Sequence, residues 1–262
     1  MKLNASTIAE LAERLENCEL RALDTHKITD DHPDMDWDDA YAIQNAIKDR
    51  KLARGERVIG LKAGLTSWAK MQQMGISTPI FGFLSESFAL ADGGACAISE
   101  LIHPKVEPEI VFVTKAALRG PGCHVADVLA ATDFVMAGIE VIDSRYRDFK
   151  FDLKSVIADN CSSSRFVLGS VARNVEDLDL RTLGVVMEKN GRTVGLGAGA
   201  AVLGHPANAV AMLANHLGRW GEEIPAGSMI LSGGVTEAIS VAAGDAIHLR
   251  MQGLGSTSLR FI

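Results

Sequence analysis

Cysteine, proline and aromatic residues are scarce in this 262-residue sequence, which has 4 Cys, 7 Pro and 5% Phe, Trp and Tyr. The cysteines lie far apart and form no Cys-x-x-Cys pattern, so neither a disulfide framework nor a structural zinc site is expected. Hydrophobic residues nevertheless make up 47% of the chain. The sequence is therefore neither disordered nor fibrous, and it can bury a sizeable core.

Long apolar runs and blocks of basic residues are also missing. No run approaches the roughly 20 residues that span a bilayer, and the segment from Met1 to Glu16 has no apolar region of the kind found in signal peptides. The net charge is −7 at pH 7, and no group of Lys or Arg is long enough to follow a phosphate backbone. We therefore expect a cytoplasmic protein that acts on a small molecule and has no nucleic-acid or membrane partner.

The first part of the chain has a helical pattern. Thr7-Ile8-Ala9-Glu10 matches a capping box, and the apolar residues that follow predict a helix to about Leu20. A second helix is predicted from Asp36, as its N-cap, to the C-terminal glycine signal at Gly55. We interpret the chain as a single domain, with residues 1–55 as a helical lead-in and residues 56–262 as a β-rich catalytic core.

After Gly55 the apolar residues follow the period of strands. Asn190-Gly191 predicts a type I′ hairpin. Helical patterns are few and irregular, and they cover residues 67–74, 125–131 and 207–217. Further strands are predicted at residues 106–113, 134–142, 165–169, 228–231, 246–251 and 256–262. The sequence thus favours an α+β fold built around a mixed, strongly bent sheet.

Three acidic residues lie within apolar segments. Glu107 and Glu109 are two apart in a predicted strand, so they point to the same side of it. An exposed strand face is the ordinary interpretation, because Glu is mostly solvated. Pro108, which indicates an edge or a bulge, and Glu140, which interrupts a second apolar run, favour a site instead. Three carboxylates suit a hard divalent cation such as Mg²⁺ or Mn²⁺.

Two further polar features have both a structural and a functional interpretation. Lys62 is the one charge in the apolar segment 58–66. It is either a lysine that reaches solvent along its stem, or a site residue that balances a substrate carboxylate or moves a proton. The polar segment 159–164, which contains Ser162 and Ser163, is either a plain turn or a loop that binds a carboxylate.

Taken together, these motifs resemble the hydratase/decarboxylase branch of the fumarylacetoacetate hydrolase superfamily. The likeness runs nearly from end to end and rests on segments 59–67, 103–109, 139–145, 158–160 and 253–261. It implies a mixed β-roll fold and a divalent metal, Mg²⁺ or Mn²⁺, bound by Glu107, Glu109 and Glu140. It also implies that Lys62 is a catalytic residue. Pro108 stands where the family often has another residue, and this leaves the Glu-x-Glu spacing intact.

Within this branch, segments 65–75 and 78–84 look like the decarboxylases. The hydratases usually have an aspartate where this chain has Ile80. The resemblance then implies loss of CO₂ from a small 2-oxo dicarboxylate, 2-oxohex-3-enedioate, in the meta-cleavage pathway of aromatic catabolism. We expect an apolar wall that excludes water from the departing carboxylate. Its predicted members are Trp68, Met71, Met74 and Ile80, and Ser162 and Ser163 are predicted to bind substrate.

The resemblance also implies partners. A 2-hydroxypentadienoate hydratase would take up the unstable dienol product, and we expect the chain itself to form a homo-oligomer. Two other functions stay open: hydration of 2-hydroxypentadienoate at the same metal, and a non-catalytic subunit that stabilises a hydratase. The second is disfavoured, because a purely structural subunit has no need for three acids that must be neutralised.

Overall fold

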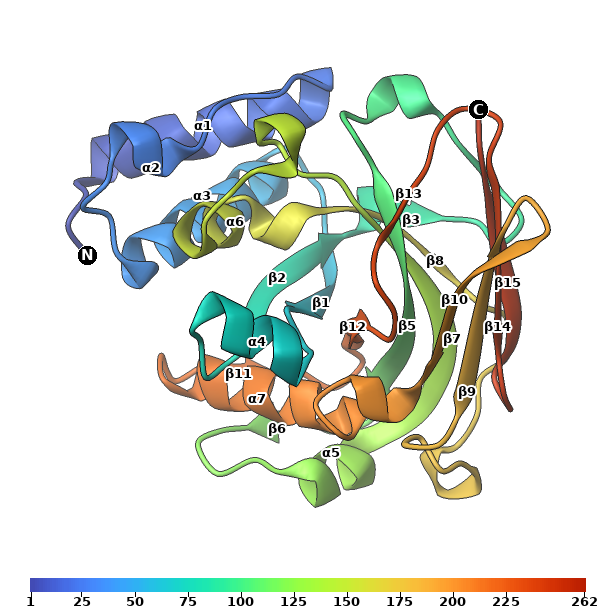
Figure 1. Cartoon of the computed structure of the whole chain (residues 1–262). Helices are drawn as coiled ribbons and strands as arrows, with labels where there is room; N and C mark the ends of the chain where they lie inside the picture. The colour runs from blue at the N-terminus through green and yellow to red at the C-terminus, as the bar shows by residue number, and fades with distance from the viewer.

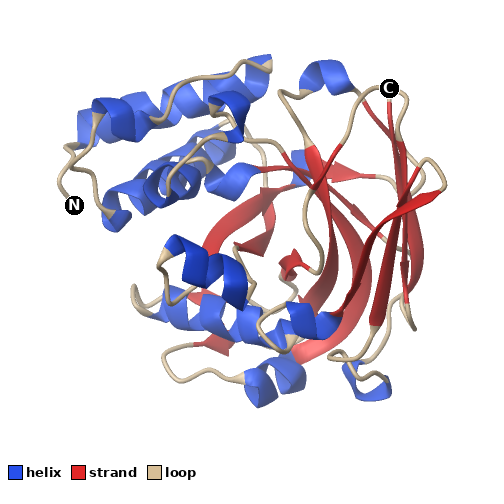
Figure 2. Cartoon of the chain, viewed as in Figure 1, coloured by secondary structure: helices blue, strands red, loops and turns tan.

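The computed structural model describes the backbone of all 262 residues, and the side chains of all except Lys70 and Met74. Two sheets face each other, and most helices gather on one side of them (Figure 1; Figure 2). The helices are α1 (Ala5–Arg21), α2 (Ile28–Asp31), α3 (Trp37–Ala53), α4 (Trp68–Met74), α5 (Val125–Ala131), α6 (Leu153–Ala158) and α7 (Pro206–Gly218). Within the described chain, none of these helices has the length and apolar character needed to cross a membrane.

The larger sheet is mixed. Its eight strands follow the order β2-β1-β12-β5-β7-β8-β3, with β13 paired to β5. They are β1 (Val58–Gly64), β2 (Ile80–Ser85), β3 (Ala89–Leu90), β5 (Lys105–Thr114), β7 (Thr132–Ile142), β8 (Ser163–Leu168), β12 (Met229–Gly234) and β13 (Ile239–Ser240). β1 runs parallel to β12, whereas β5 is antiparallel to both of its neighbours. The sheet curls strongly in Figure 1, and the expected α+β fold with a bent mixed sheet is confirmed.

A second sheet packs against the first. Its order is β10-β9-β14-β15-β4, and a separate two-stranded sheet joins β11 to β6. The bounds are β4 (Ala95–Cys96), β6 (Leu118–Arg119), β9 (Gly184–Lys189), β10 (Arg192–Ala198), β11 (Glu223–Ile224), β14 (Ala246–Met251) and β15 (Gly255–Phe261). Asn190 and Gly191 both have positive φ, of 54° and 74°, as the predicted type I′ turn between β9 and β10 requires.

The two faces of the larger sheet bury different side chains. One face packs on the smaller sheet and forms the main core, to which β5 contributes Val106, Ile110 and Phe112. The other face carries a smaller apolar cluster, made of Leu84, Phe88, Val111, Phe166 and Leu231. Because residues two apart in a strand share a face, Glu107 and Glu109 lie on the face of Val111. The predicted metal ligands therefore stand on the side of β5 that faces away from the main core.

Two local predictions need correction. Helix α1 begins at Ala5 with Asn4 as its N-cap, and Thr7 only donates its backbone N–H to Asn4 Oδ1 over 2.9 Å.

Pro108 does not mark a sheet edge, because β5 lies between β12 and β7. It does mark a bulge, which lies in the neighbouring strand β12, where the register shifts between Leu231 and Gly234. The carbonyl of Pro108 points toward this strand and accepts a hydrogen bond from the backbone N–H of Val235. The missing proline N–H would face that same side, where the ladder is already interrupted.

The helices of the N-terminal segment pack tightly onto the rest of the chain. Asp36 is the N-cap of α3, as predicted, and Gly55 follows the helix with φ +86°. Buried apolar residues of α1 and α3 form one cluster with Phe83 of β2 and with Ile157 of α6. The segment 1–55 thus shares its apolar core with strands and helices from later in the sequence.

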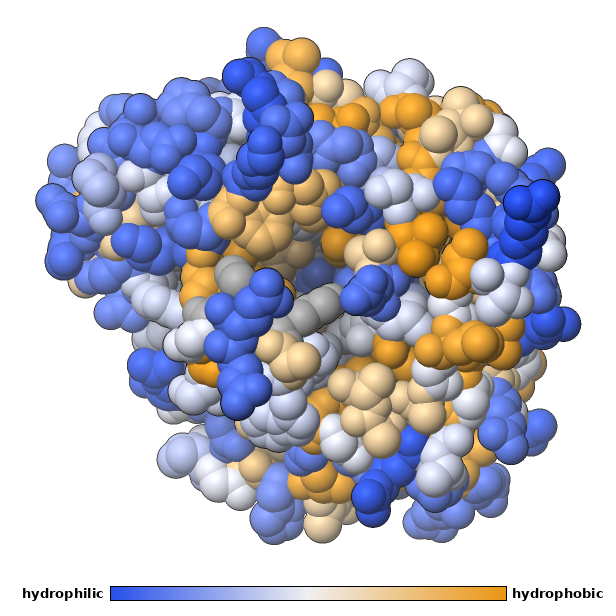
Figure 3. All heavy atoms as spheres, viewed as in Figure 1, coloured by the Kyte–Doolittle hydropathy of each residue, from blue (hydrophilic) through white to orange (hydrophobic). Residues whose placement is uncertain are grey.

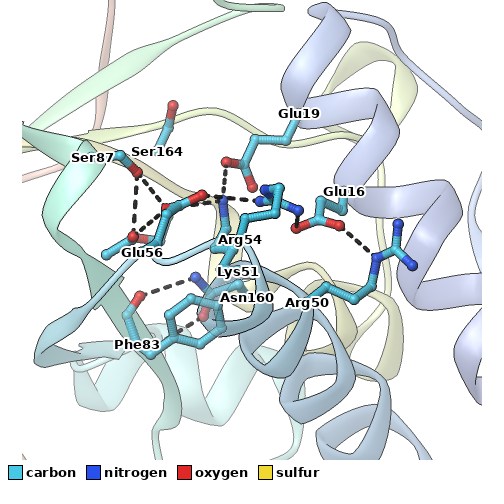
Figure 4. A network of polar contacts seen from close by, with 12 residues as sticks. Glu16, Glu19, Arg50, Lys51, Arg54, Glu56, Phe83, Ser87, Asn160 and Ser164 are labelled. Atoms are coloured by element: carbon cyan, nitrogen blue, oxygen red, sulfur yellow. Dashed lines mark hydrogen bonds and ion pairs between the residues drawn. The ribbon is translucent and has the colours of Figure 1, made fainter.

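A polar network adds to this contact (Figure 4). Lys51 of α3 is 2% exposed and pairs with Glu19 of α1 over 2.7 Å. Glu56 accepts hydrogen bonds from Ser85 and Ser87, at 2.5 and 2.7 Å, and thereby ties the end of α3 to β2 and the turn after it. Partial burial alone would raise the pKa of Glu56, but these hydrogen bonds and the neighbouring Arg54 lower it to about 2.

Glu56→Gln should therefore destabilise the protein in a pH-dependent way. A carboxylate whose pKa falls on folding stabilises the protein above its ordinary pKa of 4.5, and this contribution disappears as the pH falls toward 2. We expect a loss of about 1–3 kcal/mol in the free energy of unfolding at pH 7, which shrinks on acidification. Urea unfolding between pH 7 and pH 3 measures it, with the exposed Glu237→Gln as control. A difference that does not change with pH would contradict this role.

Candidate metal centre and active site

Four charged side chains from three strands meet on the inner face of the curled sheet. Lys62 comes from β1, Glu107 and Glu109 from β5, and Glu140 from β7, where it lies directly opposite Glu107. Each of the three acids offers an oxygen within 4.8 Å of the others. Glu109 and Glu140 are fully buried, and Lys62 is 2% exposed. The interpretation of Lys62 as a lysine that reaches solvent is therefore wrong, and so is that of the acids as an exposed strand face.

Lys62 has a defined set of partners. Its Nζ donates to Glu140 Oε2 over 2.9 Å and to the backbone carbonyl of Cys161 over 3.2 Å. Burial alone would lower the pKa of Lys62, but the Glu140 carboxylate raises it above its ordinary value, so the amine is a cation at neutral pH. An ammonium group has three N–H donors. Two of them donate to Glu140 Oε2 and to the Cys161 carbonyl, and Nζ also lies 2.8 Å from Glu140 Oε1.

Glu109 is the acid whose environment most clearly requires a cation. Its Oε2 accepts from the backbone N–H of Gly233 over 2.6 Å, whereas its Oε1 is buried and has no hydrogen-bond partner in the described part of the chain. Burial raises the pKa of Glu109 well above its usual range, and the negative charge of Glu140 raises it further. Oxygen-only ligands of this kind fit a hard divalent cation, and they do not fit zinc as well.

Two glycines at the end of β12 make room for the acids. Gly233 has φ +106°, and a Cβ atom there would lie 2.0 Å from Thr66 Oγ1. A Cβ atom on Gly234 would lie 2.9 Å from the carboxyl carbon of Glu107. Any larger residue would push on the acid cluster or strain the backbone, so the Gly-Gly pair is a requirement of the site.

A left-handed turn borders the site on the side of Lys62. The residues of η4 (Asn160–Ser162) all have positive φ, of 47°, 53° and 58°. The side-chain Oδ1 of Asn160 accepts a hydrogen bond from the backbone N–H of Phe83 at 2.9 Å, and its Nδ2 donates to the Phe83 carbonyl at 3.0 Å (Figure 4). The amide side chain thus pairs with β2 much as a strand would, and it holds the turn against the sheet.

The predicted substrate-binding residues have different surroundings. Ile80 is buried, and it lies two residues from Gly82, the cross-strand partner of Lys62, on the same face of β2. Ser163 is buried, and its Oγ has no hydrogen-bond partner among the described side and main chains. Ser162 Oγ instead lies 3.5 Å from Asp159 Oδ2.

The predicted apolar wall is only partly assembled. Trp68 is 56% exposed at the start of α4, and Met71 is buried in the main core. The side chain of Met74 lies outside the described residues. In the view of Figure 3 the surface is hollowed between the N-terminal helices and α4, in front of β1 and β5. A separate cavity of about 870 Å³ lies between α3 and α7, and none of the predicted site residues lines it.

Several groups of the site escaped the sequence analysis. The Cys161 carbonyl and the Gly233 N–H are backbone groups, which no side-chain pattern reveals. Gln44 is a buried amide of α3 that donates to the carbonyls of Phe81 and Ile157. A polar residue within the apolar face formed by Ala40, Ile43 and Ile47 indicates a buried hydrogen-bonding role, and this pattern could have identified Gln44 from the sequence.

Known proteins resemble this chain over its whole length. The family model described as fumarylacetoacetate (FAA) hydrolase, C-terminal, matches residues 62–262. A 4-oxalocrotonate decarboxylase of Pseudomonas sp. strain CF600 is 63% identical over 260 residues, which cover 99% of this chain and 98% of the relative. A 2-hydroxypent-2,4-dienoate hydratase of Pseudomonas putida is 43% identical over 84% of this chain and 99% of its own.

A solved structure shows the same fold. It is the 4-oxalocrotonate decarboxylase from Pseudomonas putida G7 complexed with magnesium and adipate, which is 59% identical and superimposes with a TM-score of 0.98. The match covers 100% of this chain and 99% of that one. The expected fumarylacetoacetate hydrolase-like fold is thus confirmed.

The acid cluster predicts opposite effects of one substitution with and without metal. Glu109→Gln removes one of three repelling charges, so the metal-free protein should be as stable as the parent or more stable. Its Mg²⁺ affinity should fall by about tenfold or more, because a charged ligand is lost. Calorimetric titration with MgCl₂ after chelation, together with melting curves, measures both effects. Parental Mg²⁺ affinity in this variant would exclude Glu109 as a ligand.

Proposed function

Because the chain belongs to the fumarylacetoacetate hydrolase family, we propose that it is a carboxy-lyase that converts 4-oxalocrotonate (2-oxohex-3-enedioate) to 2-hydroxypenta-2,4-dienoate and CO₂. The full-length identity with relatives named 4-oxalocrotonate decarboxylase carries this conclusion. The hydratases are more distant relatives. We assign Glu107, Glu109 and Glu140 as ligands of Mg²⁺, the cation present in the Pseudomonas putida G7 enzyme, and Mn²⁺ stays a prediction.

The reaction breaks the C5–C6 bond of the substrate. The electron pair of that bond forms the C4–C5 double bond, the alkene shifts to C2–C3, and negative charge develops on the C2 oxygen. When bound, a divalent cation supplies Lewis-acid stabilisation of this charge. Protonation of that oxygen gives the dienol product.

Lys62 supplies a second positive charge to the same oxygen. The ammonium group is buried and fixed by Glu140 and Cys161, so it needs little reorganisation when the charge develops. Its N–H groups can donate to the C2 oxygen or deliver a proton to it. Ile80, on the same face of the sheet, keeps the site apolar where an aspartate would bring water.

The partner proposals rest on the chemistry of the product. The dienol is unstable and is itself the substrate of a related hydratase, so we propose that the chain associates with a 2-hydroxypentadienoate hydratase and with further copies of itself. Trp68 and Ser163 are proposed to contact the substrate. Size-exclusion chromatography of the two enzymes, alone and mixed, tests the association: unchanged elution of the mixture would refute it.

A direct assay separates the candidate functions. The purified chain with Mg²⁺ should release CO₂ from 2-oxohex-3-enedioate and should leave 2-hydroxypentadienoate unchanged, because no acid at position 80 activates water. Chelation should abolish the CO₂ release, and added Mg²⁺ should restore it. Ultraviolet absorbance follows both substrates. Rapid hydration without CO₂ release would assign the chain to the hydratases, and inactivity on both would favour a non-catalytic subunit.

Lys62→Met tests the role of the buried cation. The variant keeps the length of the side chain and removes its charge. If Lys62 acts on the charge that develops in the transition state, kcat should fall by about 100-fold or more while KM changes little. Steady-state kinetics at saturating Mg²⁺ measures the two constants. A change in KM alone would show that Lys62 holds a carboxylate of the bound substrate instead.

A further inference from the structure

The proposed catalytic cation, Lys62, contacts a turn with unfavourable backbone conformation. Lys62 has two hydrogen-bond partners among the described residues, and one of them is the backbone carbonyl of Cys161, in the middle of η4. Left-handed backbone is unfavourable for residues other than glycine, and η4 has three such residues in succession. Contacts from outside the turn must therefore keep the Cys161 carbonyl in place.

Two amide side chains provide those contacts. Asn160 makes a pair of hydrogen bonds with the backbone of Phe83. Gln44 of α3 uses both hydrogens of its Nε2 on the carbonyls of Phe81 and Ile157, at 2.9 and 2.8 Å. Gln44 thus joins β2 to the end of α6, which leads directly into η4, and its Nε2 lies 4.0 Å from the sulfur of Cys161.

The turn and Lys62 both pack closely against Gly82 of β2. Gly82 of β2 is the cross-strand partner of Lys62. A Cβ atom at Gly82 would lie 2.8 Å from Asn160 Oδ1 and 3.3 Å from Lys62 Cγ. Because the turn and the lysine stem both approach this glycine so closely, a shift of the turn changes the space and the acceptor available to Lys62.

We propose that Gln44 and Asn160 are positioning residues for Lys62. They fix the Cys161 carbonyl, and that carbonyl together with Glu140 aims the ammonium group at the substrate oxygen. The N-terminal helix α3 thereby takes part in catalysis without contacting the substrate. The proposal rests on the function assigned above to Lys62.

Gln44→Met and Asn160→Gly test the proposal. Methionine keeps the volume of Gln44 without its donors, and glycine keeps the left-handed backbone of Asn160 without its amide. Each variant should lower kcat by about tenfold, as expected for a lost buried hydrogen bond, and should leave KM and the Mg²⁺ affinity within about twofold. Hydrogen exchange of the backbone amides at residues 158–163 should become faster in both variants.

Tyr41→Phe is the matched control. Tyr41 lies on the same helix, and its hydroxyl accepts from the backbone N–H of Phe81 at 3.4 Å, but it has no contact with η4 in the described hydrogen bonds. The control should keep the parental kcat and the parental exchange at 158–163. An equal loss of kcat in Tyr41→Phe would overturn the proposal, as would parental kcat or parental exchange in both test variants. Parental kcat in Lys62→Met would instead show that Lys62 has no catalytic role. In that case, faster exchange at 158–163 in Gln44→Met and Asn160→Gly would still show that these two residues stabilise the turn.

Discussion

Negative charge buried on one face of a sheet is the constraint on which this structure depends. Moving a carboxylate out of water costs several kcal/mol, and Glu109 and Glu140 are both fully buried. Among the described residues, Lys62 pairs with Glu140, and the backbone N–H of Gly233 donates to Glu109. One oxygen of Glu109 has no hydrogen-bond donor in the described part of the chain. The arrangement is therefore complete only with a bound cation, and the affinity for metal follows from the cost of burying the acids.

The three acids and Lys62 are held in place by different parts of the structure. Glu107, Glu109 and Glu140 stand on β5 and β7, whose other face packs into the main core, so the ligand set is held by paired central strands. Lys62 stands on β1, and its ammonium group contacts Glu140 of β7 and the turn at Cys161. The proposed metal ligands are thus held by sheet geometry, whereas the proposed catalytic charge of Lys62 contacts a turn that is held by side-chain amides. Helix α3, which carries Gln44, also shares an apolar cluster with β2 and α6.

The sequence predicted those features that depend on neighbouring residues. The period of two placed both acids of β5 on one face, and Asn190-Gly191 gave the hairpin. Glu140 and Lys62 stood out as single charges in apolar segments, and the resemblance to a family assigned them to one site with these acids. Pro108 predicted either an edge or a bulge, and the structure has the bulge, in the neighbouring strand β12; the proline alone does not distinguish the two. The Gly233 N–H and the Cys161 carbonyl were missed for a related reason: backbone groups reach the site only through the path of the whole chain.

The decarboxylases and hydratases that this chain resembles are related in sequence, and one half of the proposed site would serve both reactions. Both reactions pass through a dienolate or its dienol, and a cation and a lysine at the C2 oxygen serve either one. They differ at the far end of the substrate, where a hydratase must activate water and a decarboxylase must exclude it. Ile80 is 2% exposed and packs among apolar residues of the N-terminal layer. An aspartate in those surroundings would need a compensating donor or cation of its own, so the choice of reaction extends beyond a single position to the apolar layer behind it.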